Sequence, residues 1–396
     1  MAPATKRPTR RSSATKKKVR RTTTGGTADP FATRLKRLRA RLRAIDADCI
    51  VVSNPRDVAY LTGFLGGDSY LVVGSGKPTM LSDSRYAEEL EGFKKLVKVR
   101  MRTGAGMAGV AADELGARSC ERVALQGEHM TISQEIAFKK ALRSHGITGR
   151  SVVRTDGVIG ALRQIKDATE IGLLKKAIKI QEAALLATLP QIKVGMTELQ
   201  VCAILEHEMK DRGSPDPSFE TIVGARANGS LPHYTPSTTK VGARQPLLID
   251  WGATWKGYHG DMTRTFGIGG WPARVREIYK IVLEAHEASA AALGPGVSCR
   301  DVDAVARDVI AKAGYAKEFG HGLGHGIGLN VHEGPGLASR APKGNVLRPG
   351  NVVTIEPGIY LPGIGGVRIE DDYAITERGA TNLCSLPKDL AWATRR

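Results

Sequence analysis

Cysteine, aromatic residues and long apolar runs are all scarce in this chain of 396 residues. The 5 cysteines lie far apart and form no CxxC pair, which argues against a zinc–thiolate site and for a reducing compartment. Every apolar run is shorter than the roughly 20 residues that cross a membrane, and no apolar signal-peptide core follows Met1. The sequence therefore predicts a cytoplasmic protein without membrane association.

Acidic residues are absent from the first 28 positions, which contain nine Lys or Arg. This tail carries half of the formal net charge of +18 and has little to bury, so residues 1–30 are predicted to be disordered. Three interpretations stay open: non-specific binding to nucleic-acid phosphates, an organellar targeting segment, or a solvated extension without a partner. Nucleic-acid binding, if present, is expected only through residues 1–28.

An α/β domain is predicted for residues 31–160. Residues 31–45 carry leucines and an isoleucine at helical spacing between arginines, which predicts an amphipathic helix. Short apolar strands and helices then alternate, as is typical of α/β domains. The expected strands are 49–52, 70–73, 79–81, 97–101 and 123–125, and the expected helices are 57–61, 85–93, 107–115 and 133–142.

Residues 161–396 are predicted to form an α+β domain in which helices surround one antiparallel sheet. The segment 156–166 leads into it, and apolar stripes mark its helices. The expected helices are 167–189, 197–210, 273–293 and 301–313. The expected strands are 219–223, 245–252, 261–268, 351–357 and 366–376. His207, which lies between two glutamates, is expected at the surface.

Residues 319–333 hold three of the 9 histidines, among five closely spaced glycines. Glycine lets the backbone approach a ligand or metal closely, and its cost of about 1 kcal/mol per residue argues against a helix here. A mobile glycine loop with incidental histidines is the alternative interpretation. We expect instead that His321, His325 and His332 belong to a site that carries the chemistry.

Four carboxylates lie in or at the ends of apolar strands in the second half: Asp250, Asp261, Glu356 and Glu370. Asp250 and Asp261 are separated by a connection of hairpin length, so both can point to one face of a sheet. Acidic side chains are rarely buried without a partner. Two divalent cations would neutralise four carboxylates that otherwise could not all stay ionised, so the sequence predicts a dinuclear metal site.

Several motifs resemble the pita-bread metallopeptidases, in particular their Xaa-Pro aminopeptidase and Xaa-Pro dipeptidase (prolidase) branch. In the second half these are LIDWGA, GDMTRTF, GHGIGLNVHE, TIEPGIY and GVRIEDDYAIT. NPRDVAYLTGF and DSRYAEE are similar to the N-terminal domain of that family, and RQIKDATEI to the start of its catalytic domain. The resemblance implies a creatinase/prolidase-type α/β domain followed by an α+β pita-bread catalytic domain.

The family's metal ligands match five residues of this chain: Asp250, Asp261, His325, Glu356 and Glu370. The resemblance implies that Asp261 and Glu370 bridge two divalent cations. Asp250 would complete the site of one cation, and His325 and Glu356 the site of the other. Because most of these ligands are carboxylates, Mn²⁺ or Co²⁺ suits the set better than a thiolate-type zinc site, although Zn²⁺ is compatible.

Four further residues match substrate-handling positions of the family. His233 and His332 match its two main histidines, His321 a third, outer one, and Arg368 a residue that supports the carboxylates. His259 is extra to this pattern, and we expect a histidine at the rim rather than a sixth ligand.

The implied activity is hydrolysis of the bond before proline at peptide N-termini, by a hydroxide held between the metals. Glu356 would relay the proton, His332 would stabilise the oxyanion, and His233 would contact substrate beyond the scissile bond. The alternatives are a prolidase that cleaves only dipeptides and, more distantly, a non-enzymatic binding module with a nucleic-acid-binding tail. Methionine aminopeptidases share the ligands but usually lack such an N-terminal domain. A homodimer acting on proline-containing peptides is expected.

Overall fold

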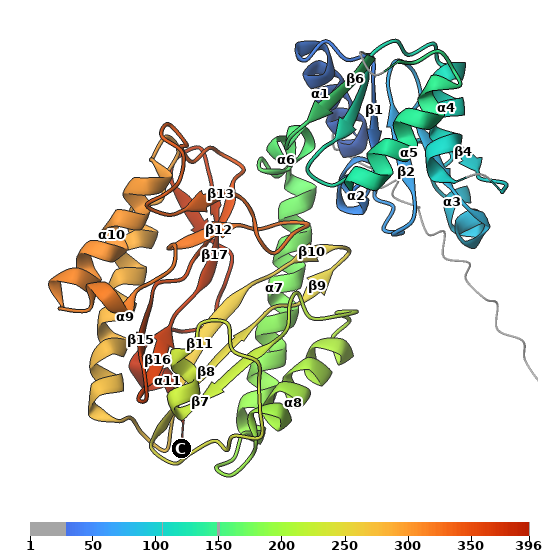
Figure 1. Ribbon diagram of the computed structural model, residues 1–396. Coiled ribbons are helices and arrows are strands. Elements are labelled where there is room, and N and C mark those ends of the chain that lie inside the picture. Colours follow the sequence, from blue (N-terminus) through green and yellow to red (C-terminus); the bar gives the residue numbers. More distant parts are fainter. Residues whose placement is uncertain (1–28, 105, 149–150, 396) are drawn as a thin grey trace, which may run out of the picture.

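The computed structural model describes residues 29–104, 106–148 and 151–395, which form two domains (Figure 1). The basic tail, residues 1–28, lies outside these ranges, so its predicted disorder stays a prediction. Asp29 and Pro30, which were predicted to belong to the tail, instead begin helix α1 (Pro30–Ala44), where Asp29 caps the backbone N–H of Phe31 at 3.0 Å. Within the described ranges, no helix is long and apolar enough to cross a membrane.

A six-stranded sheet in the order β4-β3-β2-β1-β5-β6 forms the centre of the N-terminal domain. Only β2 runs antiparallel to its neighbours. The sequence did not predict β6, because only two of its four residues are apolar. The strands are β1 (Cys49–Val52), β2 (Tyr70–Val73), β3 (Thr79–Ser82), β4 (Lys98–Met101), β5 (Val123–Gln126) and β6 (Val152–Thr155).

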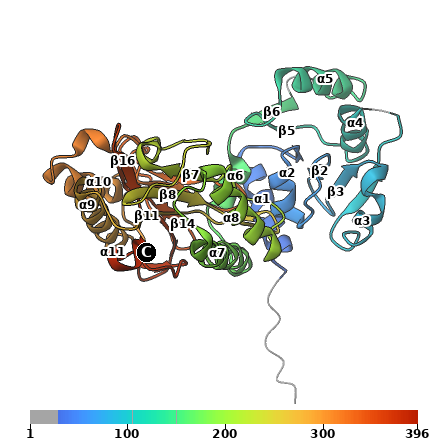
Figure 2. The same ribbon diagram turned by 90° about the horizontal axis from the view of Figure 1, so that it is seen from below.

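Alternating side chains of β1 point into two separate cores, one on each face of this sheet. Ile50 and Val52 pack with α1, α2 (Pro55–Thr62) and α3 (Ala87–Glu91). Cys49 and Val51 pack with α4 (Met107–Ala117) and α5 (Ile132–Arg143) on the other face (Figure 2). The predicted α/β domain is therefore confirmed as a sheet covered on both faces.

Two of the five cysteines are paired in this domain. Cys49 and Cys120 form a disulfide between β1 and the segment before β5, whereas Cys202, Cys299 and Cys384 are free. This pair weakens the argument from cysteine spacing for a reducing compartment. Their separation of 71 residues concealed the pairing, which arises because β1 and β5 are adjacent in the sheet.

Helices α6 (Val158–Arg163) and α7 (Ala168–Thr188) lead from one domain to the other. The predicted division between residues 160 and 161 falls within α6. Asp167 begins α7 with a capping box: its side chain accepts from the N–H of Glu170, whose carboxylate accepts from the N–H of Asp167.

The C-terminal domain contains two main sheets, so the prediction of one antiparallel sheet is wrong. The first has the order β19-β11-β8-β7 and the second β13-β12-β14-β17-β18. The first comprises β7 (Ile222–Ala225), β8 (Gln245–Trp251), β11 (Met262–Ile268) and β19 (Thr394–Arg395). The second comprises β12 (Gly324–Gly326), β13 (Glu333–Leu337), β14 (Val352–Ile355), β17 (Asp371–Ile375) and β18 (Ala380–Asn382).

Helix pairs cover the outer face of each sheet, as Figure 1 shows. Helix α7 and α8 (Glu198–Asp211) pack against the first sheet, and α9 (Ala273–Ala291) and α10 (Cys299–Lys312) against the second. The remaining elements include two hairpins, β9 (Thr254–Trp255) with β10 (Tyr258–His259) and β15 (Gly358–Leu361) with β16 (Gly365–Arg368), and helix α11 (Leu390–Ala393). Because the helices cover the outer faces of the two sheets, the inner faces can contribute side chains to a site.

Candidate metal centre

The four carboxylates predicted from the sequence come together between the two sheets. In the β8–β11 pair, Asp250 lies opposite Thr263, two residues after Asp261, so the two aspartates share a face. Glu356 follows β14, and Glu370 lies between β16 and β17. The first sheet therefore contributes Asp250 and Asp261, and the second sheet with its neighbouring hairpin contributes Glu356 and Glu370.

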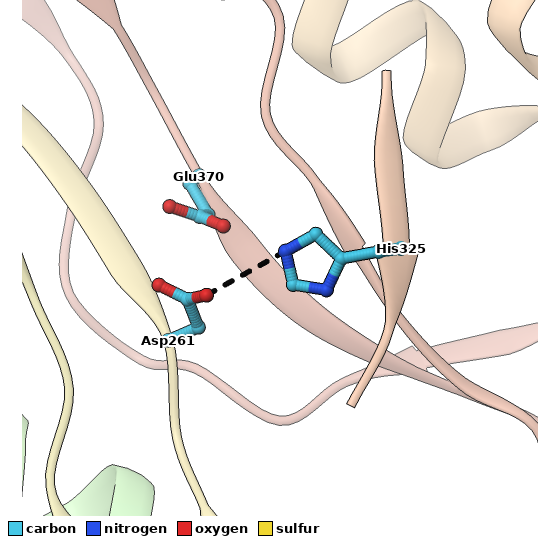
Figure 3. Close-up of side chains that lie close together, drawn as sticks. All are labelled: Asp261, His325 and Glu370. Carbon is cyan, nitrogen blue, oxygen red and sulfur yellow. Dashed lines mark ion pairs between the residues drawn. The ribbon is translucent and has the colours of Figure 1, made fainter. Parts of the chain in front are cut away.

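Three side chains form the tightest group. Ligand atoms of Asp261, His325 and Glu370 all lie within 4.8 Å of one another. Figure 3 shows the imidazole of His325 pointing from β12 toward both carboxylates. Its Nε2 is 3.6 Å from Oδ2 of Asp261 and 3.4 Å from Oε1 of Glu356. The group thus offers one nitrogen and several oxygens to a shared centre.

Hydrogen bonding fixes His325 in the form that a metal requires. Its Nδ1 lies 3.1 Å from the carbonyl oxygen of Gly326, which can only accept, so Nδ1 carries the proton. Burial, with a smaller contribution from His332, lowers the pKa of His325 to about 3. The imidazole is therefore neutral, and the Nε2 lone pair faces the carboxylates, as in metal-ligating histidines.

Among the described residues that line the cavity, one basic side chain, Arg368, faces four carboxylates. Burial raises the pKa of Glu356 to about 8, against the opposing effect of Arg368. Burial and the neighbouring acids also raise the pKa of Asp261 and Glu370 well above their usual values. Oδ1 of Asp250 is buried without a hydrogen-bond partner. An orphaned oxygen among crowded acids fits a site that divalent cations complete.

Arg368 is the one guanidinium within this group in the described part of the chain. It donates to Oδ2 of Asp250 at 2.5 Å, to Oγ1 of Thr263 at 2.9 Å and to the hydroxyl of Tyr360 at 2.9 Å. Thr263 in turn donates to Oε2 of Glu370 at 2.6 Å. Arg368 therefore orients two of the four acids, one of them through Thr263.

His321 lies in the outer part of this network. Its Nδ1 is 2.8 Å from the carbonyl oxygen of Gly322, which requires a proton on Nδ1, so Nε2 accepts from the Tyr360 hydroxyl at 2.8 Å. Burial, followed by the charge of Arg368, lowers the pKa of His321 to about 4. His321 is thus a neutral residue held by Tyr360.

A cavity of ≈ 410 Å³ opens onto the carboxylates and is lined by the predicted residues. His332 and His233 line its wall and are both exposed, His233 on the loop after a short 3-10 helix (Arg226–Ser230). The rings of His332 and His325 lie 4.3 Å apart, edge to face. All nine residues predicted for metal or substrate contact line this one cavity.

The two remaining histidines discussed above lie outside the ligand group. His259 is half-buried on β10, where its Nδ1 is 3.2 Å from Oγ1 of Thr254, and it does not line the cavity. The side chain of His207 is 71% exposed, which confirms the expected surface position.

Sequence reasoning missed three residues that hold the acids: Thr263, Thr354 and Tyr360. Thr354 accepts from the N–H of His325 at 3.0 Å and donates to Oε1 of Glu356 at 3.3 Å. Thr263 and Thr354 each lie two positions from a predicted ligand, and side chains two apart in a strand share a face. That alternation could have identified both threonines. Tyr360 ends the motif TIEPGIY, but strand alternation could not assign its role, since it lies on the separate β15–β16 hairpin.

Buried carboxylates and a neutral histidine that meet at one cavity define a candidate metal-dependent hydrolase. Comparison with known families identifies which one. Residues 172–377 match metallopeptidase family M24, and residues 34–165 match the creatinase/prolidase N-terminal domain. The chain therefore belongs to metallopeptidase family M24, in its Xaa-Pro peptidase branch, and is a metallo-exopeptidase. Family members use a dinuclear centre of divalent metal ions.

Similar proteins include both kinds of Xaa-Pro peptidase. The Xaa-Pro dipeptidase of Pyrococcus furiosus is 34% identical over 347 residues, covering 87% of this chain and 95% of that protein. The structure of the Xaa-Pro dipeptidase from Bacillus anthracis matches with a TM-score of 0.85 at 33% identity, covering 91% of this chain and 99% of that one. The structure of the X-Pro aminopeptidase from Thermotoga maritima matches with a TM-score of 0.82 at 34% identity, covering 88% of this chain and 99% of that one. Similarity therefore supports the branch and does not separate its two activities.

Proposed function

We propose that this protein is an Xaa-Pro aminopeptidase, which removes the first residue from peptides with proline in second position. The observation that favours this activity over a dipeptidase is the charge of the cavity wall. A dipeptidase has to accept the free carboxylate of proline within its site, whereas an aminopeptidase meets a neutral amide there.

The cavity wall offers little to such a carboxylate. Among the described side chains that line it, Arg368 is the single Lys or Arg, and its guanidinium is occupied by Asp250, Thr263 and Tyr360. The exposed residues of the rim include an acid, Glu220. The carboxylate of a dipeptide substrate would therefore find no unpaired Lys or Arg on this wall and would meet Glu220, so a longer peptide is the better substrate.

The proposed metal ligands are Asp250, Asp261, His325, Glu356 and Glu370, for two ions of Mn²⁺ or Co²⁺ rather than Zn²⁺. When bound, two such cations polarise the scissile carbonyl and acidify water. Glu356, oriented by Thr354, accepts the proton of the attacking water and passes it to the proline nitrogen. That nitrogen has no hydrogen of its own in the peptide, because proline is a tertiary amide.

The histidines and Arg368 act on the substrate and on the acids. His332 donates a hydrogen bond to the oxyanion, and His233, exposed at the rim, contacts the peptide beyond the scissile bond. His321 and Arg368 keep Tyr360 and Asp250 in place. Glu356→Gln with turnover equal to that of the unmodified protein would remove the proton-relay role.

A prolidase is the second candidate, and the similarity to dipeptidases from Pyrococcus furiosus and Bacillus anthracis favours it. The two candidates differ toward Ala-Pro, Ala-Pro amide and Ala-Pro-Pro-Ala, each incubated with metal-stripped protein and Mn²⁺. An aminopeptidase releases alanine from the amide and the tetrapeptide faster than from Ala-Pro. Cleavage of Ala-Pro alone would establish the prolidase, and no metal-dependent cleavage of any of the three would remove both.

Four further expectations accompany this proposal. We place the domain division at residues 160/161. We also expect a homodimer, whose mass light scattering coupled to size-exclusion chromatography measures. A cytoplasmic location is retained, although the Cys49–Cys120 disulfide weakens the cysteine argument for it. Binding of nucleic acid through residues 1–28 is tested by its loss when those residues are removed.

A further inference from the structure

Four buried charged side chains meet at the junction of the two domains, next to His332. Glu333, the residue after His332, approaches Nη2 of Arg163 at 2.5 Å and Nζ of Lys166 at 2.8 Å. Arg163 also donates to Oδ1 of Asp57 at 2.9 Å. None of these side chains is more than 9% exposed. We call Asp57, Arg163, Lys166 and Glu333 the junction cluster.

The junction cluster is anchored in the N-terminal domain. Oδ2 of Asp57, in α2, accepts from Nε2 of Gln126 at 2.6 Å. Oε1 of Gln126, the last residue of β5, accepts from the backbone N–H groups of Ser53 and Asn54 at 2.8 and 2.9 Å. Because Ser53 and Asn54 directly follow β1, hydrogen bonds run without a gap from two central strands of that domain to Glu333.

On its other side, the cluster holds the turn that carries His332. Oε2 of Glu333 accepts from the N–H of Asn330 at 3.4 Å. Oε1 lies so close to Gly328 that a Cβ on that glycine would be 2.6 Å away. The carboxylate therefore fills the inside of the turn 328–333, and His332 projects from this turn toward the ring of His325.

The charges of the cluster persist despite burial. Burial raises the pKa of Glu333, but the charges of Lys166 and Arg163 outweigh this effect and hold that pKa below its usual value. Apolar side chains of similar size can often replace a buried ionic group without loss of stability. Stability alone therefore does not explain why charged side chains occupy this junction. Directed ion pairs, unlike apolar contacts, hold the two domains in one defined geometry.

We infer that Glu333 and Arg163 are positioning residues that fix His332 at the metal pocket relative to the N-terminal domain. This inference rests on the proposed function, in which His332 stabilises the oxyanion. A misplacement of about 1 Å can lower a rate about 100-fold, so weakening the cluster should affect turnover without removing any group that touches the substrate.

Glu333→Gln tests this inference, since it keeps the shape of the side chain and removes its charge. Arg34→Gln is the matched control: Arg34 is 5% exposed and also joins the domains, with Nη2 2.7 Å from Asp167 and 3.3 Å from Glu170, but it does not touch the histidine turn. We expect Glu333→Gln to lower kcat roughly tenfold or more, with KM changed less than about twofold. Arg34→Gln should lower the unfolding temperature and leave kcat unchanged.

A second readout does not depend on activity. In metal-free protein labelled with ¹³C at histidine Cε1, the His332 resonance is assigned by its absence in His332→Gln. Glu333→Gln should shift or broaden this resonance, and Arg34→Gln should not. An unchanged resonance and kcat in Glu333→Gln, or equal losses of kcat in both variants, would overturn the inference. A shifted resonance in a protein without peptidase activity would refute the proposed function and leave the positioning role standing.

Discussion

Glu370 and Asp371 are neighbours in the chain and both buried, yet their carboxyl groups have opposite surroundings. Glu370 faces other acids, and burial together with Glu356 and Asp250 raises its pKa well above the usual value. Asp371 lies 2.6 Å from Nη2 of Arg264 and is also paired with Lys388. Although burial raises the pKa of Asp371, Arg264 and the other charges lower it below its usual value.

The strand geometry produces this contrast. Successive side chains of an extended segment point to opposite sides, so Glu370 points into the cavity lined by carboxylates and Asp371 points away from it. On β11 the neighbours Thr263 and Arg264 also point to opposite sides: Thr263 bonds to Glu370, and Arg264 bonds to Asp371. The chain therefore compensates Asp371 with Arg264 and Lys388, whereas Arg368 is the one basic side chain among the four acids that line the cavity in the described part of the chain. We expect bound cations to supply the remaining charge.

The largest expected effect concerns the pocket side of this contrast. Glu370→Gln should lower kcat/KM by at least about 1,000-fold, because several kcal/mol of transition-state stabilisation depend on the metal centre. The same change should stabilise the metal-free protein against urea, because it removes one of four mutually repelling acids. Glu377→Gln, at an exposed glutamate, is the control and should change neither. A metal-free Glu370→Gln protein less stable than the original would contradict the contrast.

Asp371→Asn should have the opposite effect on stability. It leaves Arg264 and Lys388 buried without their acid, and breaking a buried pair in this way costs about 3–5 kcal/mol. Urea denaturation of the metal-free protein measures this loss. A change below about 1 kcal/mol would show that Asp371 is not the compensated partner described above.

Glu356, in the cavity, and Asp371, outside it, should have opposite effects on how stability depends on pH. In the metal-free folded chain the pKa of Glu356 is raised from 4.5 to about 8, so the folded state retains a proton that the unfolded chain releases. The unfolding free energy should therefore fall as pH rises through this interval and level off above it. The lowered pKa of Asp371 has the reverse effect, with stability lost as pH falls below its usual value of 3.8.

Urea denaturation of metal-free protein between pH 5 and pH 8 tests this pH dependence, with Glu356→Gln as the matched variant. The variant should show a flatter profile than the original protein. A metal-free protein that gains stability over this range would contradict the raised pKa.

The smallest expected effect concerns the support of the pocket. Thr263→Val removes the hydrogen bonds to Glu370 and Arg368 and should weaken Mn²⁺ binding about tenfold. Thr265→Val is the matched control, because Thr265 lies on the same strand and bonds only to the backbone of Arg368. Equal Mn²⁺ affinities of the two variants would show that Thr263 does not orient Glu370 for metal binding.

The sequence predicted the pocket better than its surroundings. Asp250 and Asp261 were recognisable because each interrupts or begins an apolar strand, where an acid has no structural reason to be. Strands β1 to β5 were likewise predicted from short apolar runs between turns. In both cases the signal is local, since two or three neighbouring residues contain it.

Features that depend on distant contacts were not predictable in this way. The Cys49–Cys120 disulfide and the support from Tyr360 each join segments whose proximity only the fold determines. Strand β12 was not predicted from the glycine-rich segment, yet Gly324 has to lie in a sheet, where a Cβ would be 2.0 Å from the carbonyl oxygen of Thr354. Glycine there permits close strand packing, which composition alone does not reveal.

Calorimetric titration of Mn²⁺ into the metal-stripped protein at pH 8 tests most directly whether bound cations compensate the pocket acids. We expect two ions per chain, with release of protons from the carboxyl groups whose pKa is raised, and a rise in unfolding temperature on binding. Absence of binding, or binding that Glu370→Gln does not weaken, would contradict a carboxylate pocket built to be completed by metal ions.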